Sequence, residues 1–412
     1  MSNDKQVRLH LDDMAYGGAA VGRHEGKAIF VPGGIAGEEV LAEIVAERPR
    51  YARARLLEVI APSPDRVAPP CESYERCGGC QWQHIAYEAQ LRFKREIVRG
   101  QLERIGKIGA PPVLPTIGME NPWAYRNNMQ FAVDDEGHLC LMAAGTERPV
   151  AIGSCRLLCP ELTEVFDELE LDYPGLERVS LRAGRRTGEQ MLVLETAEGE
   201  APELEVDRPL SCILLLPDGT GVSLIGSTHL HEEVGGKRLR VSAGSFFQVN
   251  TEQAQQLLRL VLEYAAVQPS DTVLDAYGGV GTFGLHLAEH AAQAIIVEAN
   301  ASAAADAREN ASQAGNVRVI EGEVEDVLPT LPEAIDVAVI DPPRAGVAPR
   351  ALQALTAKHP RRIVYVSCDP GTLARDVRTL LDRGYRLETV QPVDMFPQTH
   401  HIETVSLLVS DQ

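Results

Sequence analysis

The sequence predicts an α/β protein whose C-terminal part is a parallel, doubly wound sheet. From about residue 241, apolar strands alternate with helical segments, which is typical of such a sheet. Residues 5–60 contain about five short β-rich segments separated by glycine turns, a pattern that favours a small OB-like β-barrel. Residues 115–240 mix short strands and acidic loops with one probable helix, so we expect a mixed α+β region there.

A proline-rich linker and a run of cysteines separate the barrel from the rest. Four prolines stand among residues 61–70, three cysteines follow, and residues 87–106 have the apolar spacing of a helix. We therefore divide the chain into a barrel at 1–62, a cysteine-bearing segment with a connecting helix at 63–115, a central domain at 116–240 and a doubly wound domain at 241–412.

The charge of the chain is unevenly distributed. The net charge of its 412 residues is −20, yet residues 1–110 hold 16 Lys and Arg against 15 Asp and Glu. Because local patches decide phosphate binding, two basic clusters remain candidates for nucleic-acid contacts. They could equally be solvated faces of a strand and a helix. The first cluster contains Arg48, Arg50, Arg53 and Arg55, and the second contains Arg92, Lys94, Arg95, Arg99, Arg104 and Lys107.

No apolar run approaches the ~20 residues that span a bilayer, and the first residues are polar, so we expect a cytosolic (cytoplasmic) protein without a signal peptide. In that reducing compartment we do not expect the eight cysteines to form a disulfide framework. Cys71, Cys77 and Cys80 fall within ten residues, which suggests a metal site. Zinc is the ordinary occupant of clustered cysteines, and three thiolates at this spacing need a fourth ligand from elsewhere in the chain.

A glycine-rich turn follows the first strand of the C-terminal domain. Gly278, Gly279 and Gly281 allow a ligand close to the backbone, but their spacing is a poor match to the dinucleotide fingerprint. The next strand ends at Glu298, where a carboxylate can accept hydrogen bonds from a ribose diol. These features favour S-adenosylmethionine and leave a nicotinamide-dependent dehydrogenase as the alternative.

Two further strands also end in acidic residues. Glu323 or Asp326 follows the third strand and could contact an adenine amino group. Asp341 ends the fourth strand, before two prolines that fix the turn, so its carboxylate is expected at the ligand-binding edge of the sheet. Asp341 could alternatively be only a helix cap. Arg344 could hold a phosphate or a carbonyl group.

Cys368 ends the fifth strand, just before an Asp-Pro turn and the start of a helix near Thr372. A helix N-terminus can lower the pKa of a thiol, so this cysteine is a candidate nucleophile, although buried cysteines are usually inert. Glu403 follows His400 and His401 at the start of a last apolar segment, and we expect it to face the same cleft.

A thiolate, a carboxylate and a methyl donor together suggest methylation of uracil at C5. Addition of the thiolate to C6 would make C5 nucleophilic enough to accept a methyl group. A base would then remove the proton from C5 and the cysteine would leave by elimination.

Five sequence blocks, in order, resemble those of the RNA 5-methyluridine methyltransferases, which are class I (Rossmann-like) S-adenosylmethionine-dependent enzymes. The blocks are SFFQVN, DAYGGVGTFGL, DPPRAG, VYVSCDPGTLARD and MFPQTHHIETVSLL. The resemblance covers nearly the whole chain and implies that Cys368 is the nucleophile and Glu403 the proton acceptor. It implies cofactor binding by Gln248, Tyr277, Thr282, Glu298, Glu323 and Asp341. Asp369 stands where the family usually has Asn, and its charge is expected to raise the pKa of the thiol.

The resemblance extends to the cysteines and to the barrel. Some family members bind a [4Fe-4S] cluster, and that pattern implies Cys71, Cys77, Cys80 and, by its register, Cys155 rather than Cys159 as ligands. The barrel resembles a TRAM domain, an RNA-binding module, and the central domain is expected to bind RNA as well. Tyr51, Trp82 and Trp123 would then stack on bases, with packing in a core as the alternative.

The combination of barrel and cluster is similar to that of the ribosomal-RNA branch of the family. We therefore expect a monomer that methylates a flipped-out uridine of 23S rRNA in a pocket under Asp341. Transfer RNA is the nearest alternative substrate. A non-catalytic RNA-binding or ribosome-assembly factor is the alternative from another class.

Overall fold

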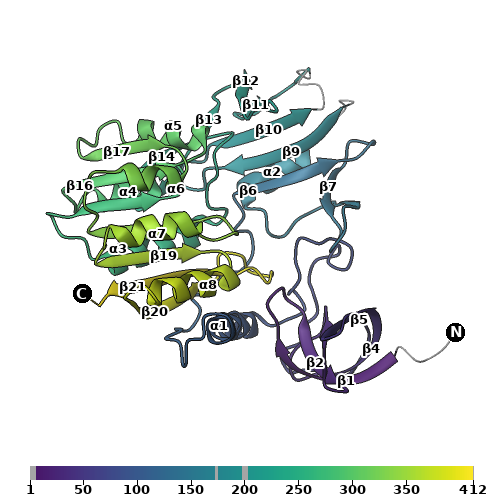
Figure 1. Cartoon of the computed structure of the whole chain (residues 1–412). Helices are drawn as coiled ribbons and strands as arrows, with labels where there is room; N and C mark the ends of the chain where they lie inside the picture. The colour runs from purple at the N-terminus through teal and green to yellow at the C-terminus, as the bar shows by residue number, and fades with distance from the viewer. Residues whose placement is uncertain (1–5, 172–174, 197–202, 412) are drawn as a thin grey trace.

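A computed structural model describes residues 6–171, 175–196 and 203–411 of the chain. The first five residues of the predicted barrel, two short stretches of the predicted central domain and residue 412 lie outside these ranges. Figure 1 shows a small barrel, a central sheet and a C-terminal sheet covered by helices, with helix α1 between the barrel and the C-terminal sheet. The predicted α/β fold class, with its N-terminal barrel and mixed central region, is confirmed.

The N-terminal strands close into a barrel in the order β1-β2-β3-β5-β4. Residues alternate between buried and exposed along β1, which places Val7, Leu9 and Leu11 inside the barrel. The barrel strands are β1 (Gln6–Met14), β2 (Ala20–His24), β3 (Lys27–Val31), β4 (Glu39–Glu47) and β5 (Tyr51–Ala61).

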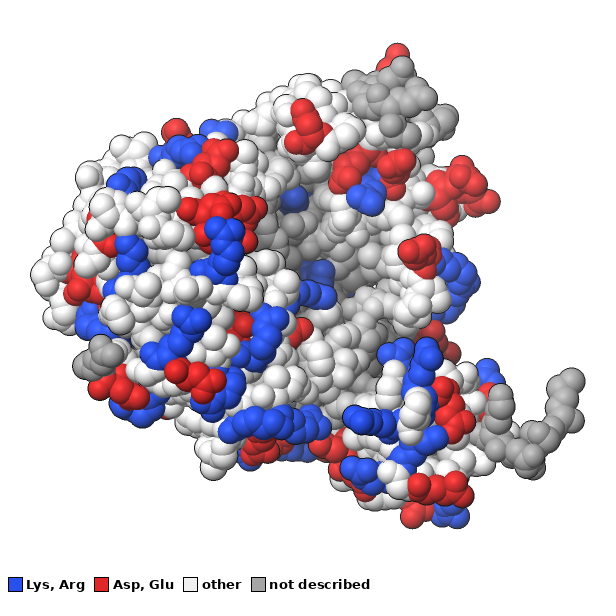
Figure 2. Space-filling view, in the orientation of Figure 1, with Lys and Arg blue, Asp and Glu red and all other residues white. Residues whose placement is uncertain are grey.

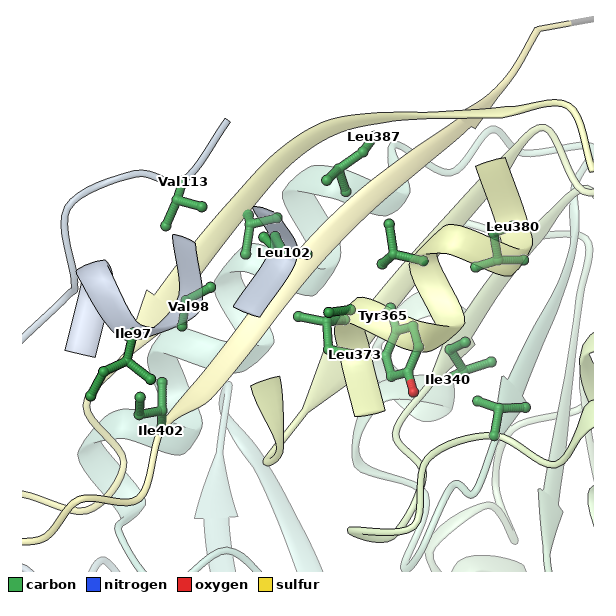
Figure 3. Packing of buried hydrophobic residues seen from close by; sticks show 14 of the residues in the cluster. Ile97, Val98, Leu102, Val113, Ile340, Tyr365, Leu373, Leu380, Leu387 and Ile402 are labelled. Carbon is green, nitrogen blue, oxygen red and sulfur yellow. The ribbon is translucent and has the colours of Figure 1, made fainter. Parts of the chain in front are cut away.

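Helix α1 (Tyr87–Arg104) connects the barrel to the rest of the chain and packs against the C-terminal domain. Ile97, Val98 and Leu102 of α1 belong to the same buried cluster as Leu373 and other residues of the C-terminal domain (Figure 3). This helix also carries Lys94, which is fully buried.

The central sheet has seven strands in the order β12-β11-β10-β9-β6-β7-β8. Only β10 and β11 pair in parallel, whereas the other neighbours are antiparallel, and helix α2 (Pro160–Glu168) packs against β9. The strands are β6 (Asn128–Val133), β7 (Leu139–Met142), β8 (Pro149–Ala151), β9 (Leu176–Ala183), β10 (Gln190–Thr196), β11 (Ser211–Leu215) and β12 (Gly221–Ile225).

A hairpin of β13 (His229–Val234) and β14 (Lys237–Ser242) leads into the C-terminal sheet, whose order is β17-β16-β15-β18-β19-β21-β20. Its first five strands along the chain run parallel, and β21 is antiparallel to both β19 and β20. The strands are β15 (Thr272–Ala276), β16 (Gln293–Glu298), β17 (Val317–Glu321), β18 (Val337–Ile340), β19 (Arg362–Ser367), β20 (Tyr385–Val393) and β21 (Glu403–Ser410).

Helices cover both faces of this sheet, as a doubly wound fold requires (Figure 1). Asn250 caps the first of them by accepting a hydrogen bond from the backbone N–H of Gln253. The helices are α3 (Thr251–Ala265), α4 (Thr282–Leu287), α5 (Ala301–Asn310), α6 (Val324–Val327) with the short 3₁₀ turn η2 (Leu328–Thr330), α7 (Pro349–Ala357) and α8 (Pro370–Leu381).

Among the described residues, no helix is both long and apolar enough to cross a lipid bilayer.

Candidate active site

All eight residues predicted to act in catalysis or cofactor binding line one cavity of about 770 Å³. The cavity lies at the carboxyl ends of the parallel strands, where open α/β sheets bind ligands. Arg344, Phe246 and Phe396 line it too. The eight are Gln248, Tyr277, Thr282, Glu298, Glu323, Asp341, Cys368 and Glu403.

The glycine turn after β15 is held by two carboxylates. The N–H of Gly279 donates to Glu298 Oε2 at 2.8 Å, and that of Gly284 donates to Asp275 Oδ2 at 2.7 Å. A Cβ atom on Gly278 would lie 2.5 Å from Ile296 Cγ2, so no larger residue fits without a shift. The turn therefore presents its backbone closely against the second strand of the sheet.

Asp341 directly follows β18, and it is one of the acidic residues that line the cavity. Burial, followed by the charges of Asp275 and Glu298, raises the pKa of its carboxyl group. Asp341 does not cap α7, the helix that follows it, because α7 begins at Pro349 and Ala348 is its cap residue. The alternative role of Asp341 as a cap of that helix is therefore wrong.

Cys368 and Glu403 are brought together by strand direction. Strand β21 runs antiparallel to β19, and Ser367 pairs with Thr404, so the residue after β19 and the first residue of β21 meet at the same sheet edge. Glu403 is 3 % exposed, and burial followed by the charge of Asp341 raises its pKa well above the usual range, with Arg344 opposing the shift.

The pKa of the Cys368 thiol is raised from 9.0 to about 12. Burial is the largest cause, followed by the charges of Glu403 and Asp341, whereas Arg344 lowers it. The prediction that the helix N-terminus would lower this pKa is therefore wrong in net effect. The predicted direction of the effect of Asp369 is confirmed, since its charge contributes to the rise.

Asp369 also fills the N-terminus of α8. Its Oδ1 accepts hydrogen bonds from the backbone N–H groups of Gly371 at 2.9 Å and Thr372 at 2.8 Å. These are the groups whose partial positive charge would otherwise favour a thiolate. These N–H groups at the start of α8 therefore donate to the side chain of Asp369.

The four cysteines predicted to hold a cluster line a second cavity, of about 230 Å³. Cys159 is fully buried elsewhere, in the cap position of α2. The pKa of Cys80 is raised to about 12, and burial is the largest cause. A hydrogen bond with Gln83 opposes the rise, and the charges of Cys155 and Cys77 add to it. Within the described ranges, no group of three or more His, Cys, Asp or Glu has the geometry to hold a metal ion.

The basic cluster on the barrel is exposed. Figure 2 shows Lys and Arg side chains on the barrel, at the margin of a hollow between the barrel and the two sheets. Arg48, Arg50 and Arg53 are exposed, and Arg55 pairs with Glu43 at 2.6 Å. The charge distribution therefore leaves cations on this surface despite the acidic chain.

Two of the three predicted base-stacking aromatics remain candidates. Tyr51 is 40 % exposed and Trp123 is half-buried. Trp82 is fully buried, and its Nε1 donates to the carbonyl oxygen of Gly18 at 2.9 Å, so the prediction that it stacks on bases is wrong. Its large side chain is instead packed in the hydrophobic core.

Sequence reasoning missed some aromatic residues at the site. Phe246 is 66 % exposed although it lines the cavity, and Phe396 lines it from the C-terminal segment. Phe246 lies in the block SFFQVN and Phe396 in the block MFPQTHHIETVSLL, so their positions in these family blocks could have identified them. Tyr16 of the barrel, whose hydroxyl donates to Asp369 Oδ2, had no local signal, because 353 residues separate the two in sequence.

A Rossmann-like sheet with this edge site is the fold of class I S-adenosylmethionine-dependent methyltransferases. A sequence model described as "tRNA (Uracil-5-)-methyltransferase" matches residues 229–411, and the TRAM domain model matches residues 5–57. An uncharacterized RNA methyltransferase of Halalkalibacterium halodurans is 39 % identical, with 98 % of this chain and 96 % of that protein covered. One of Listeria monocytogenes is 35 % identical, with 99 % and 98 % covered.

A solved structure is similar over the same length. It is the Pyrococcus abyssi tRNA (uracil-54, C5)-methyltransferase in complex with S-adenosyl-L-homocysteine, with a TM-score of 0.77, 28 % identity, and 98 % of this chain and 100 % of that chain covered. The chain belongs to the tRNA (uracil-5-)-methyltransferase family and carries a TRAM domain. It is an S-adenosylmethionine-dependent RNA (uracil-C5)-methyltransferase.

The residues of the cavity suit this cofactor. Four acidic side chains line it against the single arginine Arg344, and a cationic sulfonium group beside them would be stabilised by their charged forms. Both oxygens of Glu298 accept backbone hydrogen bonds, from Gly279 and Asn300, which fixes the carboxylate at the end of β16 for a ribose diol. The fit therefore comes from charge and from the position of an acid at a strand end.

The raised thiol pKa predicts how Cys368 responds to pH. Because only the thiolate is nucleophilic, its alkylation by iodoacetamide should accelerate about tenfold per pH unit through neutral and mildly alkaline pH. Arg344→Gln should slow the reaction further, since Arg344 lowers this pKa. Peptide-level mass spectrometry would measure the rates, and a rate that levels off below pH 9.0, the ordinary thiol pKa, would contradict the expectation.

Proposed function

We propose that this enzyme methylates C5 of a uridine in 23S rRNA through a covalent bond between Cys368 and C6 of the base. The observation that carries the proposal is the meeting of Cys368 and Glu403 at one edge of the sheet, in the cavity that also holds the predicted cofactor residues. A nucleophile and a base in one cavity are what this reaction requires.

The chain's own residues would divide the chemistry as follows. The Cys368 thiolate adds to C6 of uracil, which moves electron density to C5. S-adenosylmethionine supplies the methyl group that C5 accepts. Glu403 removes the C5 proton, and the Cys368–C6 bond then breaks to regenerate the thiolate.

Burial of Glu403 supports its role as the base. A carboxylate with a raised pKa accepts a proton more readily than an ordinary one. Arg344 lines the same cavity and lowers the pKa of both Glu403 and Cys368, and in this mechanism it would donate to the uracil oxygen that gains charge during the addition. Binding of the cofactor would be shared by Gln248, Tyr277, Thr282, Glu298, Glu323 and Asp341.

Cys368→Ala should lower methyl transfer by at least about 10⁴-fold, because the covalent step is lost. Glu403→Gln should slow release by about 10²–10⁴-fold and accumulate a protein–RNA adduct, since the methylated base cannot lose its C5 proton. Denaturing gels with labelled RNA would detect the adduct. Cys212→Ala, which removes a buried thiol of the central sheet, is the matched control and should keep activity. Full activity of Cys368→Ala would reject the mechanism.

The choice of 23S rRNA rests on the combination of an RNA-binding barrel with four clustered cysteines. Transfer RNA is the second candidate, because the similar Pyrococcus abyssi enzyme is a tRNA methyltransferase by its description.

Incubation with labelled S-adenosylmethionine and total RNA from cells that lack the enzyme, followed by sizing of the labelled species, separates these substrates. We expect label in 23S rRNA, with unlabelled 16S rRNA as an internal control. Label confined to tRNA would reject the ribosomal choice. Absence of label in every RNA would favour a non-catalytic RNA-binding or assembly factor.

We further propose that Cys71, Cys77, Cys80 and Cys155 hold a [4Fe-4S] cluster. Their convergence on one cavity supports the donor set, since such clusters take four thiolates. A cluster also places its cysteines farther apart than one ion does, because the irons lie between them. The cytoplasmic location and the monomeric state stay predictions from the sequence.

Cys155→Ser should lose the iron and the visible absorption of protein purified without oxygen, whereas Cys159→Ser should keep both. The two cysteines are four residues apart, but only Cys155 lines the cavity. Iron and sulfide assays with absorption spectra would measure this. Protein that contains stoichiometric zinc and no iron would contradict the cluster, and iron loss only in Cys159→Ser would contradict the ligand set.

A further inference from the structure

The loop between β1 and β2 of the barrel, residues 15–19, contacts both catalytic segments. The hydroxyl of Tyr16 donates a hydrogen bond to Asp369 Oδ2, in the turn that carries Cys368. Two residues later, a Cβ atom on Gly18 would lie only 2.7 Å from Cβ of His400, in the segment that leads to Glu403. An RNA-binding barrel thus reaches the turn of the nucleophile directly.

This loop is itself fixed. The carbonyl oxygen of Gly18 accepts the hydrogen bond of buried Trp82, and the backbone N–H of Ala15 donates to the carbonyl oxygen of Ala19 at 2.8 Å. Gly18 has φ +88°, where a side chain would be strained, and lacks room for a Cβ atom beside His400. The position of Tyr16 is therefore set by the barrel and the core, and not by the turn that it contacts.

The carboxylate of Asp369 divides its hydrogen bonds between two elements. Oδ1 accepts from the first N–H groups of α8, and Oδ2 accepts from Tyr16 of the barrel. Asp369 directly follows Cys368, and its negative charge contributes to the raised pKa of the thiol. A donor on Oδ2 fixes the turn and draws part of that charge away from the thiol.

We infer that Tyr16 is a positioning residue for methyl transfer, which acts on Cys368 through its hydrogen bond to Asp369. The inference rests on the proposed role of Cys368 as the nucleophile. It assigns to the barrel a second role besides RNA contact, because the barrel then completes the surroundings of the thiol.

The charges around Cys368 show why one hydrogen bond matters. Glu403 of β21, Asp341 after β18 and Asp369 before α8 all raise the pKa of the thiol in addition to burial, and Arg344 is the cation that opposes them. Burial is also the largest cause of the raised pKa of the Tyr16 hydroxyl, followed by its bond to Asp369, so Tyr16 stays a donor at neutral pH. Loss of this donor leaves Asp369 less compensated and makes the thiolate harder to form.

Tyr16→Phe keeps the ring and removes only the hydroxyl. The single-turnover rate of methylation at neutral pH should fall about tenfold, and the pH–rate profile should move about one unit to higher pH. The Kd for RNA, measured by filter binding, should stay unchanged. Tyr385→Phe is the matched control, because it also removes a tyrosine hydrogen bond, here to the carbonyl oxygen of Pro360. Tyr385 lies at the end of β20 that is far from Glu403, so this variant should change neither the methylation rate nor the pH–rate profile.

Asp369→Asn is the second variant, because an amide keeps the capping oxygen but lacks the charge. Alone, it should move the pH–rate profile to lower pH, and in this background Tyr16→Phe should cost less than about twofold. An equal loss from Tyr16→Phe in both backgrounds would overturn the inference. So would a raised KM for RNA with an unchanged kcat and pH profile, or an Asp369→Asn profile that does not move.

Circular dichroism and thermal melts would establish that each variant is folded. If Tyr16→Phe did not fold, an Asp369→Asn profile that does not move would still overturn the inference. Failure of the proposed function has a different signature. Activity of Cys368→Ala would reject the nucleophile, whereas loss of coupling between Tyr16 and Asp369 would reject only the positioning role.

Discussion

The site depends on one constraint, the direction in which the strands of the C-terminal sheet run. Parallel strands all end at the same edge, so the glycine turn, Glu298, Asp341 and Cys368 meet there although they are distant in sequence. Strand β21 is reversed, and it therefore begins where the others end. Only that reversal brings Glu403 beside Cys368, so the proposed pair of catalytic side chains is a product of topology.

Burial of acidic groups at this edge has an electrostatic cost. Asp275 and Glu403 are almost fully buried and Asp341 is partly buried, and burial raises the pKa of each. Arg344 compensates only in part. A raised pKa means that these carboxyl groups tend to keep their protons while the cleft is empty. A cation bound beside them favours their charged forms, so the same cluster of acidic groups suits the sulfonium cofactor.

The segment before Glu403 is held by residues from the N-terminal third of the chain. Lys94 of α1 forms a fully buried ion pair with Asp394, and Gln90 exchanges two hydrogen bonds with Gln398. Gln81, directly after Cys80, donates its backbone N–H to the carbonyl oxygen of Gln398. Because removal of one partner of a buried pair leaves an unpaired charge, these contacts tie the active-site segment firmly to α1 and to the cysteine-bearing segment.

The alternation of strands and helices, the barrel and the acidic strand ends could all be predicted from the sequence, because apolar patterns and glycine turns are local signals. It could not determine the reversal of β21, the topology of the central sheet or the burial of Trp82, since these depend on which distant segments pack together. The net pKa of Cys368 was likewise decided by tertiary structure. A helix N-terminus is visible in sequence, but the carboxylates that oppose it arrive from other strands, and the hydroxyl of Tyr16 arrives from another domain.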